Sequence, residues 1–257
     1  MAQTQVDNAV TTPSYNSPIE EGDFLLLECS IHSPSGGAIP VQLNVPGRLV
    51  ELNVYEDLFS NVLKGNLTML DTQGLAEAIP LIGDETLILS FLTPGGEGTQ
   101  TNANTTNQTS RTVAEEAKRQ RFKVYDCKET TLQERAKSYK LFFVSEEYVY
   151  SSKTKVSKGY SGQKYSFIVD DVMKKINKNI KSDYRKNIYI EETSTPQNVI
   201  VPNWSPFQAI NFCASRSLSD DVTPQEQTNA AANPSPRAYG SLFVFYEKLG
   251  TGFFYES

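Results

Sequence analysis

The sequence predicts an α+β protein: an antiparallel β-barrel, then a small α/β domain, then strands that begin a second barrel. Three observations predict this order. Apolar and polar residues alternate in short segments as far as residue 144, which is typical of antiparallel sheets. Helix start signals appear at residue 145, apolar residues recur at helical spacing from residue 166, and after residue 240 short aromatic strands return. We therefore expect an arm and barrel over residues 1–147, an α/β domain over 148–236, and the start of a second barrel over 237–257.

The first region is expected to hold antiparallel strands with little helix, which favours a barrel or a sandwich. Residues 1–22 are rich in Thr, Asn and Pro and are expected to form an extended arm. Alternation is clearest over 62–70, where Leu63, Leu67 and Met69 share the more apolar face. Polar residues predict turns over 33–37 and 129–135 and a long loop over 95–110. The expected strands are residues 24–31, 41–45, 48–55, 62–70, 86–92, 121–128 and 137–144.

The pattern changes at Ser145, which precedes two acidic residues and predicts a helix over 146–154. A break is expected over 159–162, because two glycines fall there. A second helix is expected from residue 166, with lysines opposite an apolar stripe. Ser205 and Pro206 predict the start of a third helix, because Ser is a good N-cap and Pro suits the first helical turn. Short strands are expected over 188–190, 199–201, 241–246 and 252–255.

The net charge of −6 hides an uneven distribution. Residues 1–100 hold 13 acidic and two basic side chains, whereas residues 151–190 hold ten basic and three acidic ones. The basic stretch, residues 153–186, lacks the aromatic and zinc-ligand patterns of nucleic-acid-binding domains, and several of its lysines fall on the polar face of the expected helix. A solvated face, or one that contacts another subunit, is therefore favoured.

Catalytic patterns are weak in this chain, and we assign no catalytic, cofactor-binding or metal-ligating residue and no cofactor. His32 is the only histidine, and no Cys or acid cluster surrounds it in the sequence. The glycines at 95, 96 and 98 lack the Lys-Ser/Thr tail of a phosphate-binding loop, and Trp204 is interpreted as a packing anchor. Cys29, Cys127 and Cys213 are interpreted as reduced, buried thiols. Adjacent acids suit glycoside hydrolysis in principle but usually diverge; they lie at 20–21, 56–57, 84–85, 146–147, 170–171 and 220–221.

Four phrases carry a resemblance to a known family: IGDETLILSF at 82–91, LFFVSEE at 141–147, TKVSKGYSG at 154–162 and VPNWSPFQAINFCASRS at 201–217. With the strand order over 52–93, they resemble the baseplate hub protein of contractile-tailed, T-even-like bacteriophages. The resemblance covers about residues 20–257. It implies tail-tube-type β-barrels interrupted by a small α/β domain. A whole second barrel needs on the order of 100 further residues, so we expect a longer chain or a second chain to complete it.

The resemblance also implies a function. A hub protein is a structural, non-enzymatic virion protein of the tail baseplate, made in the host cytoplasm. Its partners would be two further copies in a homotrimer, the tail tube protein above, the central spike protein below and other baseplate proteins. DNA would pass through an acidic lumen without specific binding, because like charges repel. Two alternatives stay open: a virion-associated glycan hydrolase, and a β-rich module that binds a host glycan. The N-terminus shows no signal peptide.

Overall fold

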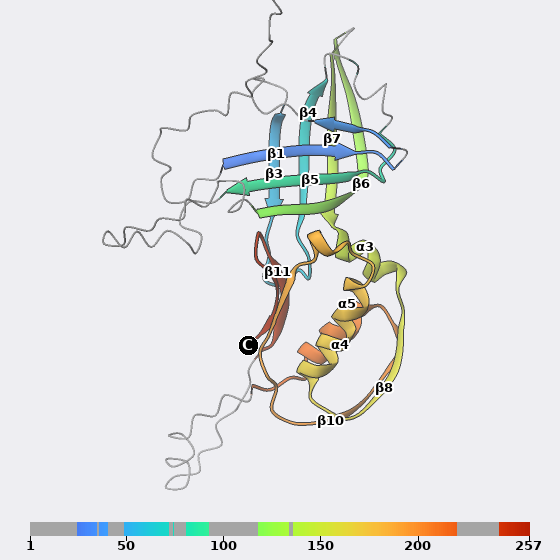
Figure 1. The fold of residues 1–257 in the computed structure, drawn as a ribbon, viewed down its shortest axis with the longest axis vertical. Coiled ribbons are helices and arrows are strands. Elements are labelled where there is room, and N and C mark those ends of the chain that lie inside the picture. Colours follow the sequence, from blue (N-terminus) through green and yellow to red (C-terminus); the bar gives the residue numbers. More distant parts are fainter. Residues whose placement is uncertain are drawn as a thin grey trace, which may run out of the picture.

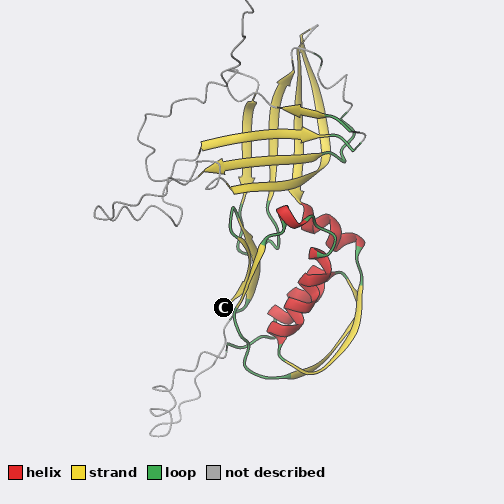
Figure 2. Cartoon of the chain, in the orientation of Figure 1, coloured by secondary structure: helices red, strands yellow, loops and turns green. Residues whose placement is uncertain are grey.

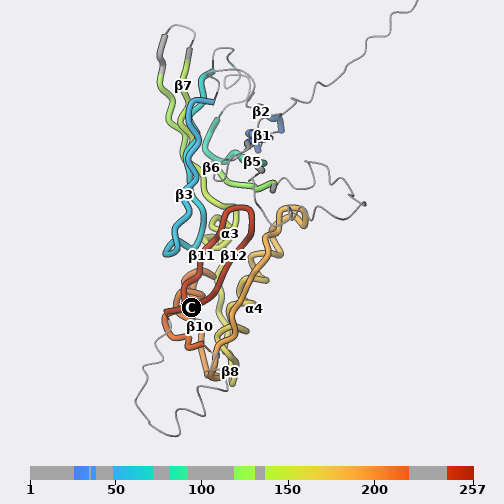
Figure 3. Tube along the Cα trace, turned by 90° about the vertical axis from the view of Figure 1, so that its left-hand side faces the viewer, coloured from blue at the N-terminus to red at the C-terminus, as the bar shows by residue number. Residues whose placement is uncertain are grey.

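The computed structural model describes residues 25–34, 36–40, 49–71, 74, 81–92, 118–133, 136–219 and 242–257. These residues form two units, one above the other in Figure 1. The first is a curled β-sheet, and the second combines helices with short strands. Figure 3 shows in a perpendicular view that the units follow one another along the long axis, with β7 running toward the second unit.

The first unit is a seven-stranded sheet with antiparallel pairing throughout. Its strand order is β2-β1-β5-β6-β7-β4-β3. The strands are β1 (Leu25–His32), β2 (Ala38–Pro40), β3 (Leu49–Tyr55), β4 (Lys64–Asp71), β5 (Thr86–Leu92), β6 (Lys118–Gln133) and β7 (Ala136–Ser145).

Strand β6 belongs to both halves of this sheet. Its first part pairs with β5 and its second part with β7, and the β7 register shifts between Val124 and Asp126. A bulge of this kind bends a strand and increases its twist. In Figure 1, β1 and β5 consequently run across the direction of β3, β4 and β7. The sheet therefore curls around one of its own faces.

The inner face of the curl holds the first apolar core. The predicted face of Leu63, Leu67 and Met69 is buried there, which confirms that prediction. Each such fully buried aliphatic side chain stabilises the fold by about 1.5–3 kcal/mol. The other members come from β1, β5, β6 and β7: Cys29, Ile31, Leu87, Leu89, Phe91, Phe122, Val124, Tyr139, Leu141 and Phe143.

The predicted antiparallel, β-rich class is confirmed for this unit, but the described strands form an open curled sheet. Among them, β2 pairs only with β1 and β3 only with β4, so both outer strands present free edges. The tail-tube-type barrel of the sequence analysis is thus a half-barrel in the part of the chain that the structure describes.

The second unit begins where β7 ends, and its helices lie between two layers of strands (Figure 2). One layer is the three-stranded sheet β11-β12-β9, and the other is the two-stranded ribbon β8-β10. The elements are α3 (Glu146–Lys153), β8 (Val156–Gln163), α4 (Tyr165–Asn177), η1 (Ser182–Tyr184), β9 (Asn187–Ile190), β10 (Gln197–Trp204), α5 (Pro206–Ala214), β11 (Val244–Lys248) and β12 (Gly252–Glu256).

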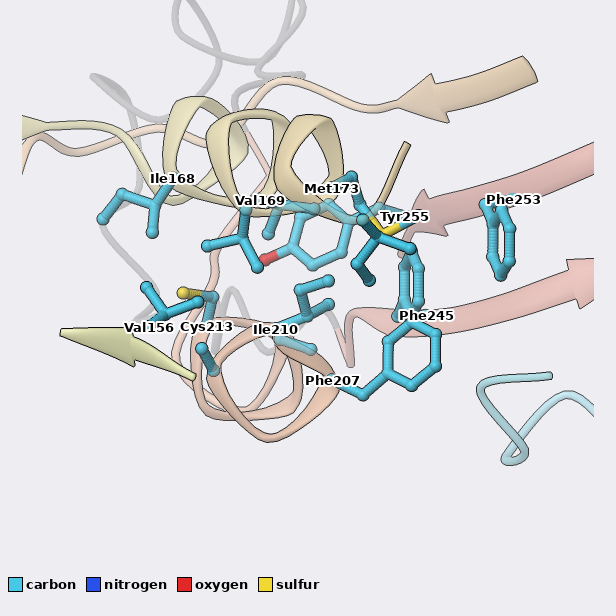
Figure 4. Close-up of a cluster of buried hydrophobic side chains, with 14 of the residues drawn as sticks. Val156, Ile168, Val169, Met173, Phe207, Ile210, Cys213, Phe245, Phe253 and Tyr255 are labelled. Carbon is cyan, nitrogen blue, oxygen red and sulfur yellow. The ribbon is translucent and has the colours of Figure 1, made fainter. Parts of the chain in front are cut away.

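A second core fills the space between these layers. Val169 and Met173 of α4 face Ile210 of α5 and Tyr255 of β12 in Figure 4. The apolar stripe that predicted α4 is the buried one, since its members at 169, 172, 173 and 176 are 0% exposed. Amphipathic periodicity therefore predicted this helix and its buried face correctly.

The last two strands do not stand apart from this unit. β11 pairs with β12, and β12 pairs in parallel with β9. Phe245, Phe253 and Tyr255 face the helices and belong to the second core. The start of a second barrel over residues 237–257 stays a prediction; among the described strands, β11 and β12 belong to the sheet of the second unit.

Other local predictions had mixed outcomes. Two were wrong: the glycine break at 159–162 lies inside β8, and the polar turn at 129–135 is largely strand, because β6 stays paired with β7 as far as Gln133. The turn at 33–37 is confirmed by the bond from Ser33 N–H to Gly37 O, 3.0 Å. The arm at 1–22, the strand at 41–45 and the loop at 95–110 lie outside the described residues.

Candidate functional site: a buried ionic junction between the two units

The most unusual chemistry in the described residues lies where the two units meet. Strand β7 runs directly into α3, and the Ser145 N–H donates to Leu63 O at 3.1 Å. The Leu63 N–H in turn donates to Oε2 of Glu247 on β11 at 3.0 Å. The backbone at Leu63, just before β4, is therefore held by the end of β7 and by β11 of the second unit.

Three buried charged side chains, Glu147, Lys186 and Glu247, form what we call the buried ionic cluster. Lys186 Nζ lies 2.8 Å from Glu147 Oε2 and 2.5 Å from Glu247 Oε1. The side chains of the three residues are 2%, 8% and 0% exposed, in that order. The ammonium also lies 5.9 Å from the Phe122 ring centre and 5.7 Å from that of Phe253. The Lys186 ammonium thus links Glu147 of α3 to Glu247 of β11 and lies near one aromatic ring from each unit.

The cluster carries two carboxylates for one ammonium, and its pKa values reflect this excess. Burial raises the pKa of Glu147 to about 6, although the Lys186 ammonium opposes the rise. Burial alone would lower the pKa of Lys186, but the two carboxylates outweigh it and raise that pKa to about 12. Lys186 therefore stays charged at neutral pH, and its nitrogen is enclosed by its partners. The geometry suits a fixed structural joint and offers no accessible nucleophile.

A second set of contacts lies beside the cluster. Arg119 and Arg121 are two positions apart on β6, and their guanidinium carbons lie 5.8 and 5.4 Å from the ring centre of Tyr184 on η1. Arg121 also lies 3.5 Å from Oε2 of the buried Glu146, and Arg119 pairs with Glu28 at 2.9 Å. The Tyr184 ring of the second unit thus makes cation–π contacts with two arginines of the first unit. Each such contact at an exposed site stabilises the structure by about 0.5–1 kcal/mol.

Further hydrogen bonds join the two units. The Asn61 side chain donates to Asn211 Oδ1 at 2.7 Å and to the Phe245 carbonyl at 3.1 Å. The Leu249 N–H donates to Glu56 Oε2 at 2.8 Å. The units therefore share buried charges, ring contacts and backbone bonds, which fixes their relative orientation.

The adjacent acids of the sequence analysis point to separate partners wherever they are described. Glu146 and Glu147 bind Arg121 and Lys186 respectively, and Asp170 and Asp171 bind Lys174 and Lys158. Glu56 accepts from Leu249, whereas Asp57 accepts from the Phe59 N–H. Glu85 accepts from the Ile82 and Gly83 N–H groups, whereas Asp84 lies 3.7 Å from Lys123. The pairs at 20–21 and 220–221 lie outside the described residues.

The other residues that the sequence analysis considered for catalysis or binding have local partners or are buried in the fold. His32 ends β1, with Nε2 3.0 Å from Ser30 Oγ, and Trp204 packs on Phe212 at 5.0 Å between ring centres. The cysteines are free, and burial raises the pKa of Cys29 and Cys213 to about 12 and that of Cys127 to about 11, so their thiols stay protonated at neutral pH. Within the described ranges, no group of three His, Cys, Asp or Glu residues could hold a metal ion, and no helix is long and apolar enough to cross a membrane.

Sequence reasoning missed the buried ionic cluster. It placed Lys186 in the basic stretch and expected that stretch to face outward, which is wrong for Lys186. It interpreted Glu147 only as a complement to the helix dipole. The one available signal was that Glu247 follows the aromatic run SLFVFY, where an acid on the buried face of a strand requires a cation.

The architecture is a β-rich fold that occurs among phage tail proteins. The 43 kDa tail protein of prophage MuSo2 from Shewanella oneidensis matches with a TM-score of 0.50 over 90% of this chain and 54% of that chain, at 9% sequence identity. The tail protein from Neisseria meningitidis MC58 matches with a TM-score of 0.46 over 89% of this chain and 49% of that chain, at 6% identity. This chain thus spans about half the length of these tail proteins. No protein-family model and no curated protein matches it.

Proposed function

We propose that this chain is a structural subunit of a phage tail baseplate, a hub that joins the tail tube to the central spike. The observation that carries the proposal is the fold shared with the MuSo2 tail protein. Its partners would be two further copies in a homotrimeric ring, the tail tube protein, the central spike protein and other baseplate proteins. The proposed location is the virion.

The free edges of the curled sheet support a ring. Edge strands present unpaired N–H and C=O groups, which readily pair with a neighbouring chain. β3 is such an edge among the described strands, and its Val50 is 60% exposed. Leu58 and Phe59 follow it at 48% and 78% exposed, so apolar surface continues past the strand. Large exposed apolar patches mark interaction sites in soluble proteins.

The junction supports a role as a rigid connector. A subunit that links a tube to a spike must hold two surfaces at a constant angle. The buried ionic cluster resists rearrangement, because separating Lys186 from either acid would leave a charge buried without its partner. An enzyme would instead need an accessible reacting group, and the acids described above are committed to structural partners.

Charge suggests how the subunit would face its neighbours. The acidic first 100 residues are proposed to line or rim the DNA channel, where they would repel phosphate. The exposed lysines of the second unit, such as Lys174 and Lys178, are proposed to meet acidic neighbours on the outer side. Lys186 has no part in this, because it lies in the buried ionic cluster.

The assembled mass tests the ring. Native mass spectrometry should give three times the chain mass of 28.6 kDa. Val50→Lys should shift the protein toward monomer without unfolding it, because a charge on an edge strand opposes pairing. Ile200→Lys is the matched control, since Ile200 is 77% exposed but lies on β10. A monomer that clears a cell-wall suspension would favour the hydrolase, and a monomer that binds a glycan array would favour the adhesion module.

A second experiment tests the charged face. Charge reversal of Lys174 and Lys178 should weaken binding to baseplate proteins, most visibly at low salt, where the Debye length is about 30 Å at 0.01 M. The unmodified chain should show negligible DNA binding in a gel-shift assay. Tight, salt-sensitive DNA binding that charge reversal removes would contradict the proposed role of these lysines and indicate nucleic-acid recognition.

A further inference from the structure

One sheet edge in the second unit has the features of a peptide-binding site. β9 is the outer strand of the sheet β11-β12-β9, and β12 is the only described strand that pairs with it. The Glu191 N–H donates to Tyr255 O of β12 at 2.9 Å. Backbone groups alternate in direction along a strand. Ile188 and Ile190 therefore direct their N–H and C=O groups away from β12, toward the free edge.

A depression lies along this same edge. Its volume is about 550 Å³, and it separates β9 from the first half of α4. The half-buried Ile188 and Ile190 form one wall, and Phe167 of α4, 49% exposed, forms part of the other. Polar groups from the end of β8 and from the residues after β9 surround this apolar part. The full lining is Gly162, Gln163, Lys164, Ser166, Phe167, Asp170, Ile188, Ile190 and Glu192.

The outer face of the sheet supplies a second binding feature at the same edge. Tyr246, Phe254 and Tyr189 lie side by side on β11, β12 and β9, with ring centres 5.5 and 4.8 Å apart and planes within 16° of parallel in both pairs. Tyr189 is the end of this stack and is 46% exposed. One face of the Tyr189 ring stacks on Phe254, and the other face is directed toward the free edge of β9. A fourth strand added at this edge would place its own side chain against that second face.

Charge along the edge changes sign. The exposed Arg185 precedes β9, whereas Glu191 and Glu192 follow it and Asp170 lines the depression. Lys164 pairs with Glu192 at 3.1 Å and offsets part of that negative charge. A strand laid along β9 would thus be favoured if it carried an acid beside Arg185 and a base beside Glu191 and Glu192.

We propose that the free edge of β9 binds an extended peptide segment of another protein by strand addition. Unpaired backbone groups in a row select an extended backbone as their partner, and pockets for alternate side chains then select its sequence. In this site one side chain stacks on Tyr189, and its two neighbours enter the depression beside Ile188 and Ile190. The occupant is therefore a strand with a central aromatic residue, flanking aliphatic residues and oppositely charged ends.

Binding of a designed peptide tests this site. The probes are two fluorescent heptapeptides: glutamate, threonine, valine, tyrosine, valine, threonine, lysine, and the same order reversed. These cover the parallel and antiparallel orientations. One of them should bind the full chain saturably in fluorescence anisotropy. Tyr189→Ala should weaken that binding about fivefold, as expected for one cross-strand aromatic pair. Ile200→Ala, at an aliphatic residue on β10 that is 77% exposed, should leave it unchanged.

Two further readouts distinguish strand addition from nonspecific adhesion. N-methylation of alternate peptide amides should abolish binding in one register and preserve it in the other, because only one peptide edge pairs with β9. Hydrogen exchange should slow at the Ile188 and Ile190 amides when the probe binds. The proposal fails if neither heptapeptide binds below 1 mM or if both methylation registers lose binding equally. It also fails if the same amides are protected by self-association before any peptide is added, which would make a second copy the occupant.

Discussion

Leu63 and Glu247 are 184 positions apart, yet the Leu63 N–H donates to Glu247 Oε2 at 3.0 Å. The same carboxylate is the ion-pair partner of Lys186. One buried side chain therefore satisfies a backbone donor of the curled sheet and a cation of the second unit. This arrangement makes the relative position of the two units part of the folded state, because neither group has access to water as a substitute.

Lys186→Met should strongly destabilise the protein at neutral pH. The change leaves Glu147 and Glu247 buried together without a cation, and breaking a buried pair typically costs about 3–5 kcal/mol. Guanidinium unfolding measures the effect. Lys178→Met, at an exposed lysine just after α4, should change stability by less than about 0.5 kcal/mol. Replacing all three cluster residues, as Glu147→Gln, Lys186→Met and Glu247→Gln, should restore much of the loss. A triple variant no more stable than Lys186→Met would contradict this account.

Glu147 should give the protein a distinctive pH dependence. Its pKa is raised from 4.5 to about 6 by burial, so the folded state binds this proton more tightly than the unfolded state. The stability from this group is complete below about pH 4.5 and is lost as the pH rises to about 6. Relative to Glu147→Gln, the unfolding free energy of the wild type should therefore fall by about 2 kcal/mol across that interval. Carboxyl groups outside the buried ionic cluster titrate in both proteins and cancel in the difference. A constant difference between pH 4.5 and 7 would refute the assignment.

Gly65→Ala should disrupt the first unit. A Cβ at this position would lie 2.3 Å from the Asn53 carbonyl oxygen and 2.3 Å from Phe143 Cζ. The oxygen belongs to the neighbouring strand, so relief requires movement of β3, at a cost of at least about 1–3 kcal/mol. Gly159→Ala is the matched control, since a Cβ there meets nothing within 4 Å. Thermal unfolding should show a lower Tm only for Gly65→Ala.

Leu67→Asp should destabilise the sheet unit by several kcal/mol, because it buries a carboxylate without a partner. Leu67 is 0% exposed in the first core. Val50→Asp, on the edge strand β3 and 60% exposed, should cost less than about 0.5 kcal/mol in the monomer. Urea midpoints of both variants provide the comparison. Equal losses of stability in the two variants would contradict the placement of Leu67 in the buried core.

Local signals explain what could be predicted of the fold. The third helix begins at Pro206, and the Gln208 N–H donates to Ser205 Oγ at 3.4 Å, as the capping pattern predicted. The strand at 86–92 matches β5, a short apolar run whose residues 86–91 are all buried, because such a run of a few residues is typical of a buried strand. The glycine break at 159–162 was wrong because pairing with β10, a strand some distance along the chain, keeps this segment extended despite its glycines.

The sequence by itself determined the antiparallel first region, the helices α3, α4 and α5, the buried stripe of α4 and the buried face at Leu63, Leu67 and Met69, because these depend on residues within a few positions of one another. Only the tertiary structure decided which distant groups complete them. The Ser166 N–H of α4 donates to Thr193 Oγ1, and the Phe207 N–H of α5 donates to Ser151 Oγ of α3. It likewise decided that β12 lies parallel to β9, and that Lys186, one of ten basic residues in its stretch, is the one buried between two acids. These choices depend on how elements pack, because burial sets the cost of every unpaired charge and N–H, and no short stretch of sequence contains that information.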